Sequence, residues 1–460
     1  MTQGRSTRLR PPAFILIALL AAPVVSRAEP TIHPSLAGRF RLTTFASGLN
    51  FPSSMQQLAD GSLLVGTSDP ASGGSIYNST GSLLRFTDTN RDGVADGPGQ
   101  VVATGLTGTV TSVRQAGELL FVTSSRPGQE KITVMRMGSS PGDSLTALGT
   151  IDFAFPSNTL HTTYALAVRE SSTTPGSFQL FFNVGSRTNA DRTTTPVPVS
   201  GLIDADLNGD SIYRVTVTDS GSGAPSFSAP EQIATGLRNA AGIAFDPLTG
   251  DLFFQDNGID GLSNSNEPHS ADELNRIAVG DIGGAIEDFG FPDDFVPYRT
   301  GGQGGSDDSL LVAFQPIPDP SNGLEAEGAN EIAFAPDTFR SILGHGVFIG
   351  FHGRFNGAPS GVDAENPLVF YDLASDSYIH FIEGNQDGLG HLDGLLATGD
   401  RLYLSDLSTI GPVTFGGAGQ GAIYVLTAII PEPSSVALTA LGLAGLFGLA
   451  ARRSRRSRLG

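Results

Sequence analysis

The sequence has no cysteine, no tryptophan and, among 27 basic residues, a single lysine, Lys131. Without cysteine the protein cannot form disulfides, use a thiolate nucleophile or bind a metal through sulfur. Acidic residues outnumber basic ones, and the formal net charge is -19. Binding to nucleic acid is therefore not expected, because contacts to phosphate need a basic surface. An acidic surface suits solubility and the binding of divalent cations.

The sequence also lacks three common catalytic motifs. It contains no Gly-x-Ser-x-Gly, no glycine-rich phosphate loop and no His-Glu-x-x-His. These motifs place a serine nucleophile, a nucleotide phosphate and a zinc ion, respectively. The sequence therefore gives no support to a serine hydrolase or a zinc protease.

The N-terminal end of the chain has the layout of a targeting segment. Three arginines precede the apolar run 13–25, and Ser-Arg-Ala at 26–28 offers a cleavage site with small flanking residues. This order is typical of a secretory signal peptide. We therefore predict a signal peptide over residues 1–28 and expect the protein to be exported.

The C-terminal end carries a second signal. Pro-Glu-Pro at 431–433 precedes the apolar run 434–451, and five arginines follow. About 18 apolar residues reach the lower limit for a membrane helix, and the arginines would stay on the cytoplasmic side. The order of these elements in 430–460 resembles the bacterial PEP-CTERM sorting signal. The resemblance implies transient membrane anchoring, processing by an exosortase, and a final location in the periplasm, in the outer envelope or outside the cell. A plain tail anchor is the alternative.

Between these ends, residues 29–429 repeat one pattern six times. Each unit begins with a short segment, often rich in glycine, that we call the lead. The lead is followed by an apolar strand, by a turn that usually contains glycine, and by a second apolar strand that ends in a polar loop. The first strands of the six units are predicted at 55–58, 110–113, 164–168, 242–245, 332–335 and 395–397. Antiparallel pairs repeated in this way predict an all-β protein, a six-bladed β-propeller, in which no blade can bury its faces alone. A pair of β-sandwiches fits the strand count but not the repeated lead.

The loops that enter the innermost strands of a propeller converge on one face. His161 leads the third unit, Arg238 and Asn239 lead the fourth, and His391 leads the sixth. The imidazole of His161 could act as a general base, or it could bond a carbonyl as a structural histidine. The guanidinium of Arg238 beside an amide suits a carboxylate or quinone oxygen, but it could equally pair with a carboxylate of a neighbouring blade.

The polar loop of the fourth unit is crowded with oxygen donors. Between Asp256 and Glu273 it contains several Asp, Asn and Glu residues, including Asp260 and Asp272. Carboxylate and amide oxygens at this density suit calcium, with backbone carbonyls as further ligands. A solvated loop held by turns is the alternative.

A second acidic run has part of the spacing of an EF-hand loop. Its donors at loop positions 1, 3, 5 and 9 are Asp88, Asn90, Asp92 and Asp96. Position 12 is a glycine, where an EF-hand needs a bidentate glutamate. We expect an Asp-Gly turn between outer strands that could bind calcium weakly, and a shorter run at 204–210 is a weaker candidate still.

These residues resemble the soluble glucose/sorbosone dehydrogenase family, six-bladed propellers that use pyrroloquinoline quinone (PQQ) and calcium. The segments that carry the resemblance are 236–239 (Gly-Leu-Arg-Asn), 242–245, 251–258, 272–277, 280–292 and, separately, His161 with 178–189. Together with weaker matches near 347–354 and 391–405, the resemblance extends loosely over most of residues 40–427.

The resemblance implies an exported oxidoreductase that oxidises a hydroxyl or aldehyde of a sugar or polyol with PQQ and calcium. It implies that His161 takes the proton of the substrate hydroxyl while a hydride passes to the quinone. Arg238 and Asn239 would hold cofactor and substrate, and Asn257 and Arg354 are further candidates for binding the cofactor.

The resemblance also implies a calcium site. Backbone carbonyls at Gly258 and Ile259 would ligate the ion, and Asp260 and Asp272 are the nearby carboxylates that we add to this set. The sequence departs from the family at Ile259, where the family commonly continues with Gly-Pro or Gly-Arg-Asp.

A second departure concerns the positive charge expected around PQQ, which is a tricarboxylate. His391 stands where the family has an arginine at the start of the last blade, and His352 or Arg354 would have to supply a cation from the fifth. Two other functions therefore stay open. One is a non-catalytic propeller of the cell envelope or extracellular matrix that binds glycan or protein, and the other is a calcium-dependent lactonase.

Overall fold

The computed structural model describes residues 30–430 except 71–75, 77–78, 127, 141, 172–173, 175, 261–268, 299–309, 316–327, 353–367, 383–391 and 409–417. The predicted signal peptide and nearly all of the predicted sorting signal lie outside the described residues, so both stay predictions. Within the described part of the chain, no helix combines the length and the apolar character that a membrane span requires.

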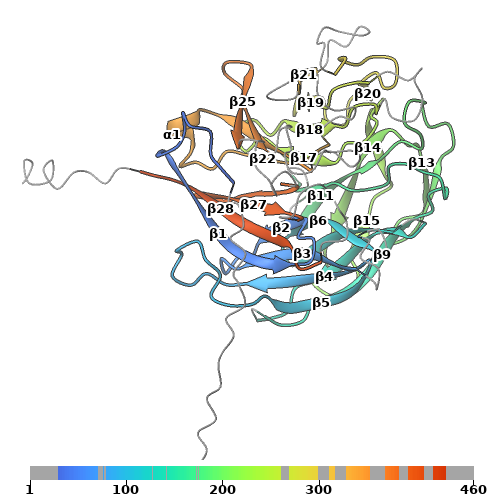
Figure 1. Ribbon diagram of the computed structural model, residues 1–460. Helices are drawn as coiled ribbons and strands as arrows, with labels where there is room; N and C mark the ends of the chain where they lie inside the picture. Colours follow the sequence, from blue (N-terminus) through green and yellow to red (C-terminus); the bar gives the residue numbers. More distant parts are fainter. Residues whose placement is uncertain are drawn as a thin grey trace, which may run out of the picture.

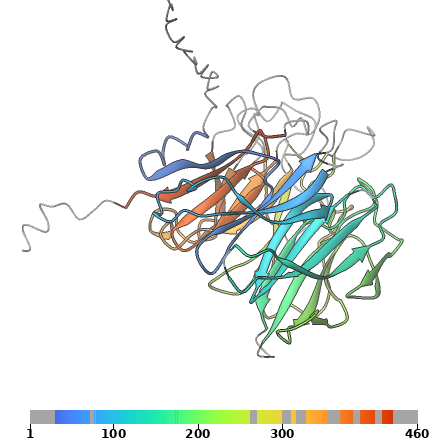
Figure 2. The same ribbon diagram turned by 90° about the horizontal axis from the view of Figure 1, so that it is seen from below.

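The described strands form six sheets, which are the blades of a six-bladed β-propeller (Figures 1 and 2). This arrangement confirms the predicted all-β fold. Blade 1 consists of β2 (Ser54–Gln57), β3 (Leu63–Pro70), β4 (Ser79–Phe86) and β5 (Gln100–Thr107). Blade 2 consists of β6 (Thr109–Ala116), β7 (Leu119–Ser125), β8 (Glu130–Arg136), β9 (Thr146–Phe153), β12 (Val197–Gly201) and β13 (Ala205–Leu207). Blade 3 consists of β10 (Leu166–Glu170), β11 (Ser177–Val184), β14 (Ser211–Thr218), β15 (Ser226–Phe227), β16 (Glu231–Thr235) and β20 (Glu287–Asp288).

The second half of the chain forms the other three blades. Blade 4 consists of β17 (Gly242–Phe245), β18 (Leu252–Asp256), β19 (Glu273–Ile277) and β21 (Leu310–Ala313). Blade 5 consists of β22 (Ala329–Phe334), β23 (Gly346–Phe351), β24 (Leu368–Asp372) and β25 (Ser377–Ile382), with the short helix α1 (Arg340–Leu343) before β23. Blade 6 consists of β26 (Gly394–Ala397), β27 (Arg401–Asp406), β28 (Gly421–Ala428) and β1 (Phe40–Leu49).

The innermost strands are β2, β6, β10, β17, β22 and β26, and each lies beside the next around a central channel. All six overlap the strands predicted from the repeated pattern. We call the end of the channel where these strands begin the entry face, and the end where they finish the exit face. His161, Arg238 and Asn239 lie just before β10 and β17, so they belong to the entry face.

The ring is closed by the two ends of the propeller chain. Strand β1 pairs antiparallel with β28, from Phe40 opposite Ala428 to Leu49 opposite Gly421. The first strand therefore completes the last blade through backbone hydrogen bonds. The repeated pattern alone did not predict this pairing, because its partners are far apart in the sequence.

Apolar side chains fill the space between neighbouring blades. Between blades 2 and 3, Phe121, Ile132 and Phe182 are fully buried. Between blades 5 and 6, Phe348 and Leu404 are fully buried in the same way. Complete burial of one such side chain contributes roughly 1.5–3 kcal/mol. This packing fixes the blades relative to one another, so loops from different blades meet at the entry face in a defined arrangement.

Candidate functional site

The imidazole of His161 is oriented by the loop that follows β11. The backbone N–H of His161 donates to the carbonyl of Ser186 at 3.0 Å, and its Nδ1 lies 3.1 Å from Ser186 Oγ. The Ser186 hydroxyl donates its single proton to the carbonyl of Thr188 at 2.7 Å. Nδ1 of His161 must therefore carry the ring proton and donate to Ser186. In the neutral imidazole this leaves Nε2 with a lone pair, which is the form that a general base requires.

The surroundings of His161 keep the ring neutral. Burial lowers the pKa of His161 well below its usual value, and the positive charge of Arg238 lowers it further. The neighbouring Gly185 allows the backbone of His161 to approach closely, because a Cβ at this position would lie 2.7 Å from His161 Cβ and 3.0 Å from its carbonyl oxygen. Burial and Arg238 thus favour a neutral imidazole, and among the described residues the ring bonds the hydroxyl of Ser186 and no carbonyl.

Arg238 is almost completely buried and is held by two loops. Its Nε donates to the carbonyl of Asn189 at 3.1 Å, and its Nη2 donates to Asn189 Oδ1 at 2.7 Å and to Asp260 Oδ2 at 2.6 Å. Charge-assisted bonds of this kind fix the plane of the guanidinium. Nη1 has no hydrogen-bond partner among the described residues, so this nitrogen can still donate to a ligand. The paired carboxylate comes from the polar loop of blade 4 itself, not from a neighbouring blade.

Asp256, at the end of β18, shapes the turn that presents Arg238 and Asn239. Its carboxylate accepts the backbone N–H of Arg238 at 2.9 Å and that of Asn239 at 2.6 Å. Burial raises the pKa of Asp256 to about 7, and the two N–H donors oppose this shift. Asp256 therefore acts on the backbone and is not exposed to a ligand.

Two predicted cofactor-binding amides lie together beside this turn. Asn239 Nδ2 donates to Asn257 Oδ1 at 2.7 Å, and Asn257 Nδ2 donates to the carbonyl of Ala329 at 2.6 Å. Oδ1 of Asn239 is buried and has no hydrogen-bond partner within the described part of the chain. A buried acceptor without a donor costs free energy, so a bound group with an N–H or O–H would stabilise the site.

Asp272 is one of the predicted calcium ligands, but its carboxylate is occupied by backbone donors. The N–H groups of Gly258 and Ala329 donate to its two oxygens, each at 2.8 Å. Burial raises the pKa of Asp272 to about 6, against the effect of these two donors. Gly258 lies so close to the carbonyls of Ser270 and Ala271 that no side chain would fit.

The other two predicted calcium ligands are also engaged. The carbonyl of Ile259 accepts the N–H of Ser270 at 3.0 Å. Asp260 pairs with Arg238, and its carbonyl accepts Nδ2 of Asn189 at 2.7 Å. Among the residues that the structure describes, no three His, Asp or Glu side chains converge as a metal site. Calcium at Gly258, Ile259, Asp260 and Asp272 stays a prediction.

The second acidic run lies between β4 and β5, away from the inner-strand leads. Asp88 accepts the backbone N–H groups of Asp92 and Gly93, each at 3.0 Å, and pairs with Arg401 of blade 6 at 3.1 Å. The run therefore forms an Asp-Gly turn, as expected, which also ties blade 1 to blade 6. Calcium binding by Asp88, Asn90, Asp92 and Asp96 stays a prediction.

Three basic residues of the last two blades are candidates for the positive charge near the cofactor, and the structure describes one of them. Arg354 and His391 lie outside the described residues. His352 follows β23, and its ring packs against Gly328, where a Cβ would lie 2.1 Å from the ring. The cation that the resemblance requires from the last two blades is therefore not placed by the structure.

The structure reveals three entry-face residues that the sequence did not single out. Ser186 and Asn189 orient His161 and Arg238, and both belong to the polar segment that directly follows the buried strand β11. Arg126 follows β7, is exposed, and makes no ion pair among the described residues. Its neighbour Ser125 lies 3.0 Å from Thr162, the residue after His161. The signal available in the sequence was the position of each residue in the short polar segment that follows an apolar strand.

Comparisons with known proteins agree with the fold. No protein-family model matches the chain, and no curated protein sequence matches it. The chain is similar to the structure of PQQ-bound aldose sugar dehydrogenase from Streptomyces coelicolor, with 18% identity, a TM-score of 0.53, and coverage of 87% of this chain and 100% of that one.

Two fungal structures are similar to the same extent. One is the calcium structure of a Trichoderma reesei carbohydrate-active enzyme of family AA12, with 16% identity, a TM-score of 0.51, and coverage of 88% of this chain and 98% of that one. The other is the holo form of the PQQ domain of pyranose dehydrogenase from Coprinopsis cinerea, with 16% identity, a TM-score of 0.50, and coverage of 87% and 97%. At these identities the likeness establishes a shared fold.

Proposed function

We propose that the protein is an exported, PQQ-dependent oxidoreductase that oxidises a hydroxyl or aldehyde group of a sugar or polyol. The observation that carries this proposal is the neutral imidazole of His161, whose Nε2 lone pair is left open beside the guanidinium of Arg238. The sugar dehydrogenases of the same fold, two of them described with PQQ, give independent support.

The residues of the entry face fit a planar quinone that carries carboxylates. Nη1 of Arg238 is available, and a planar guanidinium matches a carboxylate or a pair of carbonyl oxygens. Arg126 adds an exposed positive charge next to Ser125, which contacts Thr162, and Asn239 offers a buried acceptor without a donor among the described residues. Arg238, Asn239 and Asn257 would therefore hold the cofactor, with Arg354 as a further candidate.

PQQ, if bound by Arg238, Asn239 and Asn257, would supply a quinone able to accept one hydride, and with it two electrons, from the substrate carbon. In the proposed reaction, Nε2 of His161 accepts the proton of the substrate hydroxyl. Ser186 holds the proton on Nδ1, so the base is present in the correct tautomer before the substrate arrives. Arg238 favours the negative charge that develops on oxygen as that proton leaves.

We also propose that the oxidoreductase activity depends on calcium. A solved enzyme of the same fold is described as a calcium structure. The described oxygens of Ile259, Asp260 and Asp272 accept protein hydrogen bonds, so we assign no chemical step to calcium. Loss of activity on chelation, restored by added calcium, is the expected result.

Export and sorting are part of the same proposal. The layout of residues 1–28 supports secretion, and that of 430–460 supports transient anchoring and processing by an exosortase. Mass spectrometry of the native protein tests both points. Mature protein that begins near residue 29 and lacks the arginine cluster is expected, and a full-length cytoplasmic protein would contradict it.

A non-catalytic propeller that binds glycan or protein is the second candidate. It is favoured by the pairing of Arg238 with Asp260 at 2.6 Å, because this carboxylate offsets the positive charge that a tricarboxylate cofactor would need. Glycan-array binding that is unchanged in His161→Ala would support this alternative.

The deciding experiment separates cofactor binding from turnover. The purified protein is titrated with PQQ, with and without calcium, and binding is followed by absorbance. Dye reduction is then measured with a panel of aldoses and polyols, for the native protein and for His161→Gln. We expect micromolar binding in both proteins and turnover only in the native one. If neither protein binds PQQ at micromolar concentration, the oxidoreductase proposal fails.

A further inference from the structure

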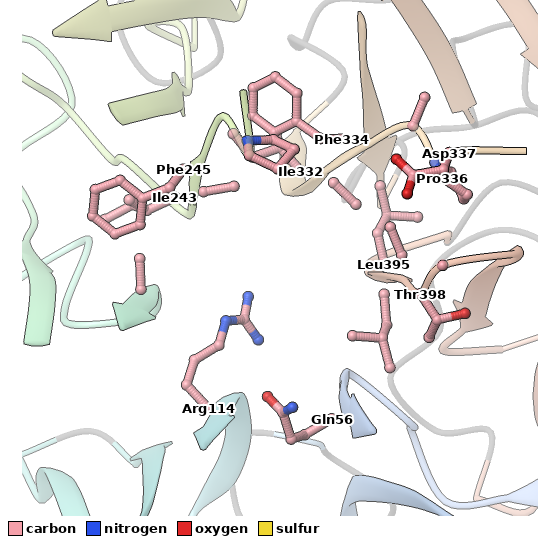
Figure 3. Close-up of a pocket in the computed structure, with 18 of the residues that line it drawn as sticks. Gln56, Arg114, Ile243, Phe245, Ile332, Phe334, Pro336, Asp337, Leu395 and Thr398 are labelled. Carbon is pink, nitrogen blue, oxygen red and sulfur yellow. The ribbon is translucent and has the colours of Figure 1, made fainter. Parts of the chain in front are cut away.

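The exit face of the channel contains a cavity that the proposed function does not use. Its volume is about 400 Å³, within the usual range of roughly 300–1,000 Å³ for small-molecule sites. Figure 3 shows that side chains from several inner strands point into it. Its apolar walls are formed by Ile243, Phe245, Ile332, Phe334 and Leu395. The cavity is therefore suited to an apolar molecule of moderate size.

A single guanidinium projects into this apolar space. Arg114 extends from β6 toward the middle of the cavity (Figure 3). Its Nη2 pairs with Glu331 of β22, and its Nη1 donates to the carbonyl of Val113 at 2.9 Å. Strands β6 and β22 belong to blades 2 and 5, which lie opposite each other in the ring, so the pair crosses the channel. Arg114 is therefore held in place before any ligand binds.

The crossing ion pair separates the cavity from the entry face. Glu331 is buried, and its second oxygen accepts the backbone N–H of Leu395 at 3.2 Å. None of the residues that line the cavity belongs to the group around His161 and Arg238. The cavity is thus a distinct site at the other end of the channel.

Each guanidinium group that lines the cavity is paired with a carboxylate. Arg114 pairs with Glu331, and Arg340 pairs with Asp337 at 3.1 Å. The side chain of Arg114 is 18% exposed, and its Nε has no partner among the described residues. This Nε–H group is therefore available to an acceptor atom of a ligand, and it lies beside the apolar walls of the cavity.

We propose that the exit-face cavity binds a small organic carboxylate with an apolar body, such as an aryl or branched alkyl acid. The carboxylate lies against Arg114, because a guanidinium binds a carboxylate through parallel hydrogen bonds. The apolar body packs against Phe245, Phe334 and Leu395. Such a ligand and a PQQ molecule at the entry face would not compete, since the Arg114–Glu331 pair lies between them.

The test uses a matched pair of probes, 4-phenylbutyrate and its neutral amide, measured by calorimetry on the full chain. We expect the carboxylate to bind about tenfold more tightly than the amide, a ratio that corresponds to roughly 1.4 kcal/mol. In the double variant R114Q/E331Q, which removes both charges together, the two probes should bind equally. Equal binding to the native protein, or no binding of the carboxylate at millimolar concentration, overturns the proposal.

A second variant pair fixes the location and does not depend on the charged residues. Thr398→Trp places a large ring at the rim of the cavity, and Ser341→Trp adds the same ring at an exposed position that does not line it. Binding of 4-phenylbutyrate should be lost in the first variant and kept in the second. Unchanged binding in Thr398→Trp shows that the acid binds elsewhere and refutes the assignment.

Discussion

The hydroxyl of Ser186 should determine which nitrogen of His161 carries the proton. Because this hydroxyl already donates to the carbonyl of Thr188, it can only accept from Nδ1. In Ser186→Ala the acceptor is lost, so no hydrogen bond to this residue stabilises the tautomer that carries the proton on Nδ1. We expect the imidazole to populate both neutral tautomers, one of which carries the proton on Nε2 and cannot act as the base.

The size of the effect follows from one hydrogen bond. A bond of this type contributes about 1 kcal/mol net, which corresponds to a roughly fivefold change in a population ratio at room temperature. The turnover number should therefore fall by about fivefold at most, while PQQ binding should change little. The pKa of His161 should stay low, because its main cause is burial and not the serine.

Nitrogen-15 NMR of labelled histidine measures the tautomer directly, and dye reduction measures turnover. Ser125→Ala is the matched control, because this nearby hydroxyl bonds Thr162 and not the imidazole. The reasoning is refuted if Ser186→Ala keeps the proton on Nδ1, or if the control shifts the tautomer equally. A change in turnover without a change in tautomer would also refute it.

Three further predictions concern cofactor binding, local packing and pH. Arg238→Lys should weaken PQQ binding by about tenfold, because one ammonium cannot replace the planar set of donors; binding equal to that of the native protein would contradict this. Gly185→Ala should displace the His161 ring and lower turnover about tenfold with a stability loss of roughly 1–3 kcal/mol, whereas Gly97→Ala, with open space around it, should be neutral. Burial raises the pKa of Asp393 from 3.8 to about 7, so its contribution to stability is present below about pH 4 and is lost as the pH rises through about 7. Asp393→Asn should therefore raise the urea midpoint more at about pH 8 than at about pH 5, and an equal change at both would contradict this assignment.

The innermost strands could be predicted because their signal is local. In the segment 236–250, a glycine lead, an apolar strand and a turn follow one another within a few residues, and the same order recurs in other blades. Each repeat occupies an equivalent position in the ring, so a wrongly predicted strand in one repeat would not have changed the predicted fold. The pairing of β1 with β28 has no such local signal, because it depends on where the chain ends meet in space.

The candidate site was predicted only in part. His161, Arg238, Asn239 and Asn257 could be placed on one face because they lead or follow strands of the repeat. Their hydrogen-bond partners could not be predicted, because a pairing such as that of Arg238 with Asp260 depends on the path of two loops. From the sequence, Arg238 could either bind a ligand or pair with a carboxylate of the protein. The structure contains elements of both, since Nη2 pairs with Asp260 and Nη1 is available to a ligand.

The donor-rich loop shows why composition alone is a weak guide to a metal site. Asp, Asn and Glu side chains are numerous there, but several of their oxygens stabilise the backbone instead. Asp256 holds the turn before β17, and Asp272 bonds the N–H groups of Gly258 and Ala329. Buried N–H groups must have acceptors, and in these turns the two carboxylates supply them.

The two ends of the channel follow from the same geometry but differ in chemistry. Inner strands begin at one face, where polar leads from successive blades bring together His161, Arg238 and Asn239. They finish at the other, where Phe245 and Phe334 line an apolar cavity instead. Between these two ends, the Arg114–Glu331 pair joins opposite blades across the channel. A propeller of this kind can therefore hold a polar reaction site and an apolar binding site on a single axis, and each can be altered without rebuilding the other.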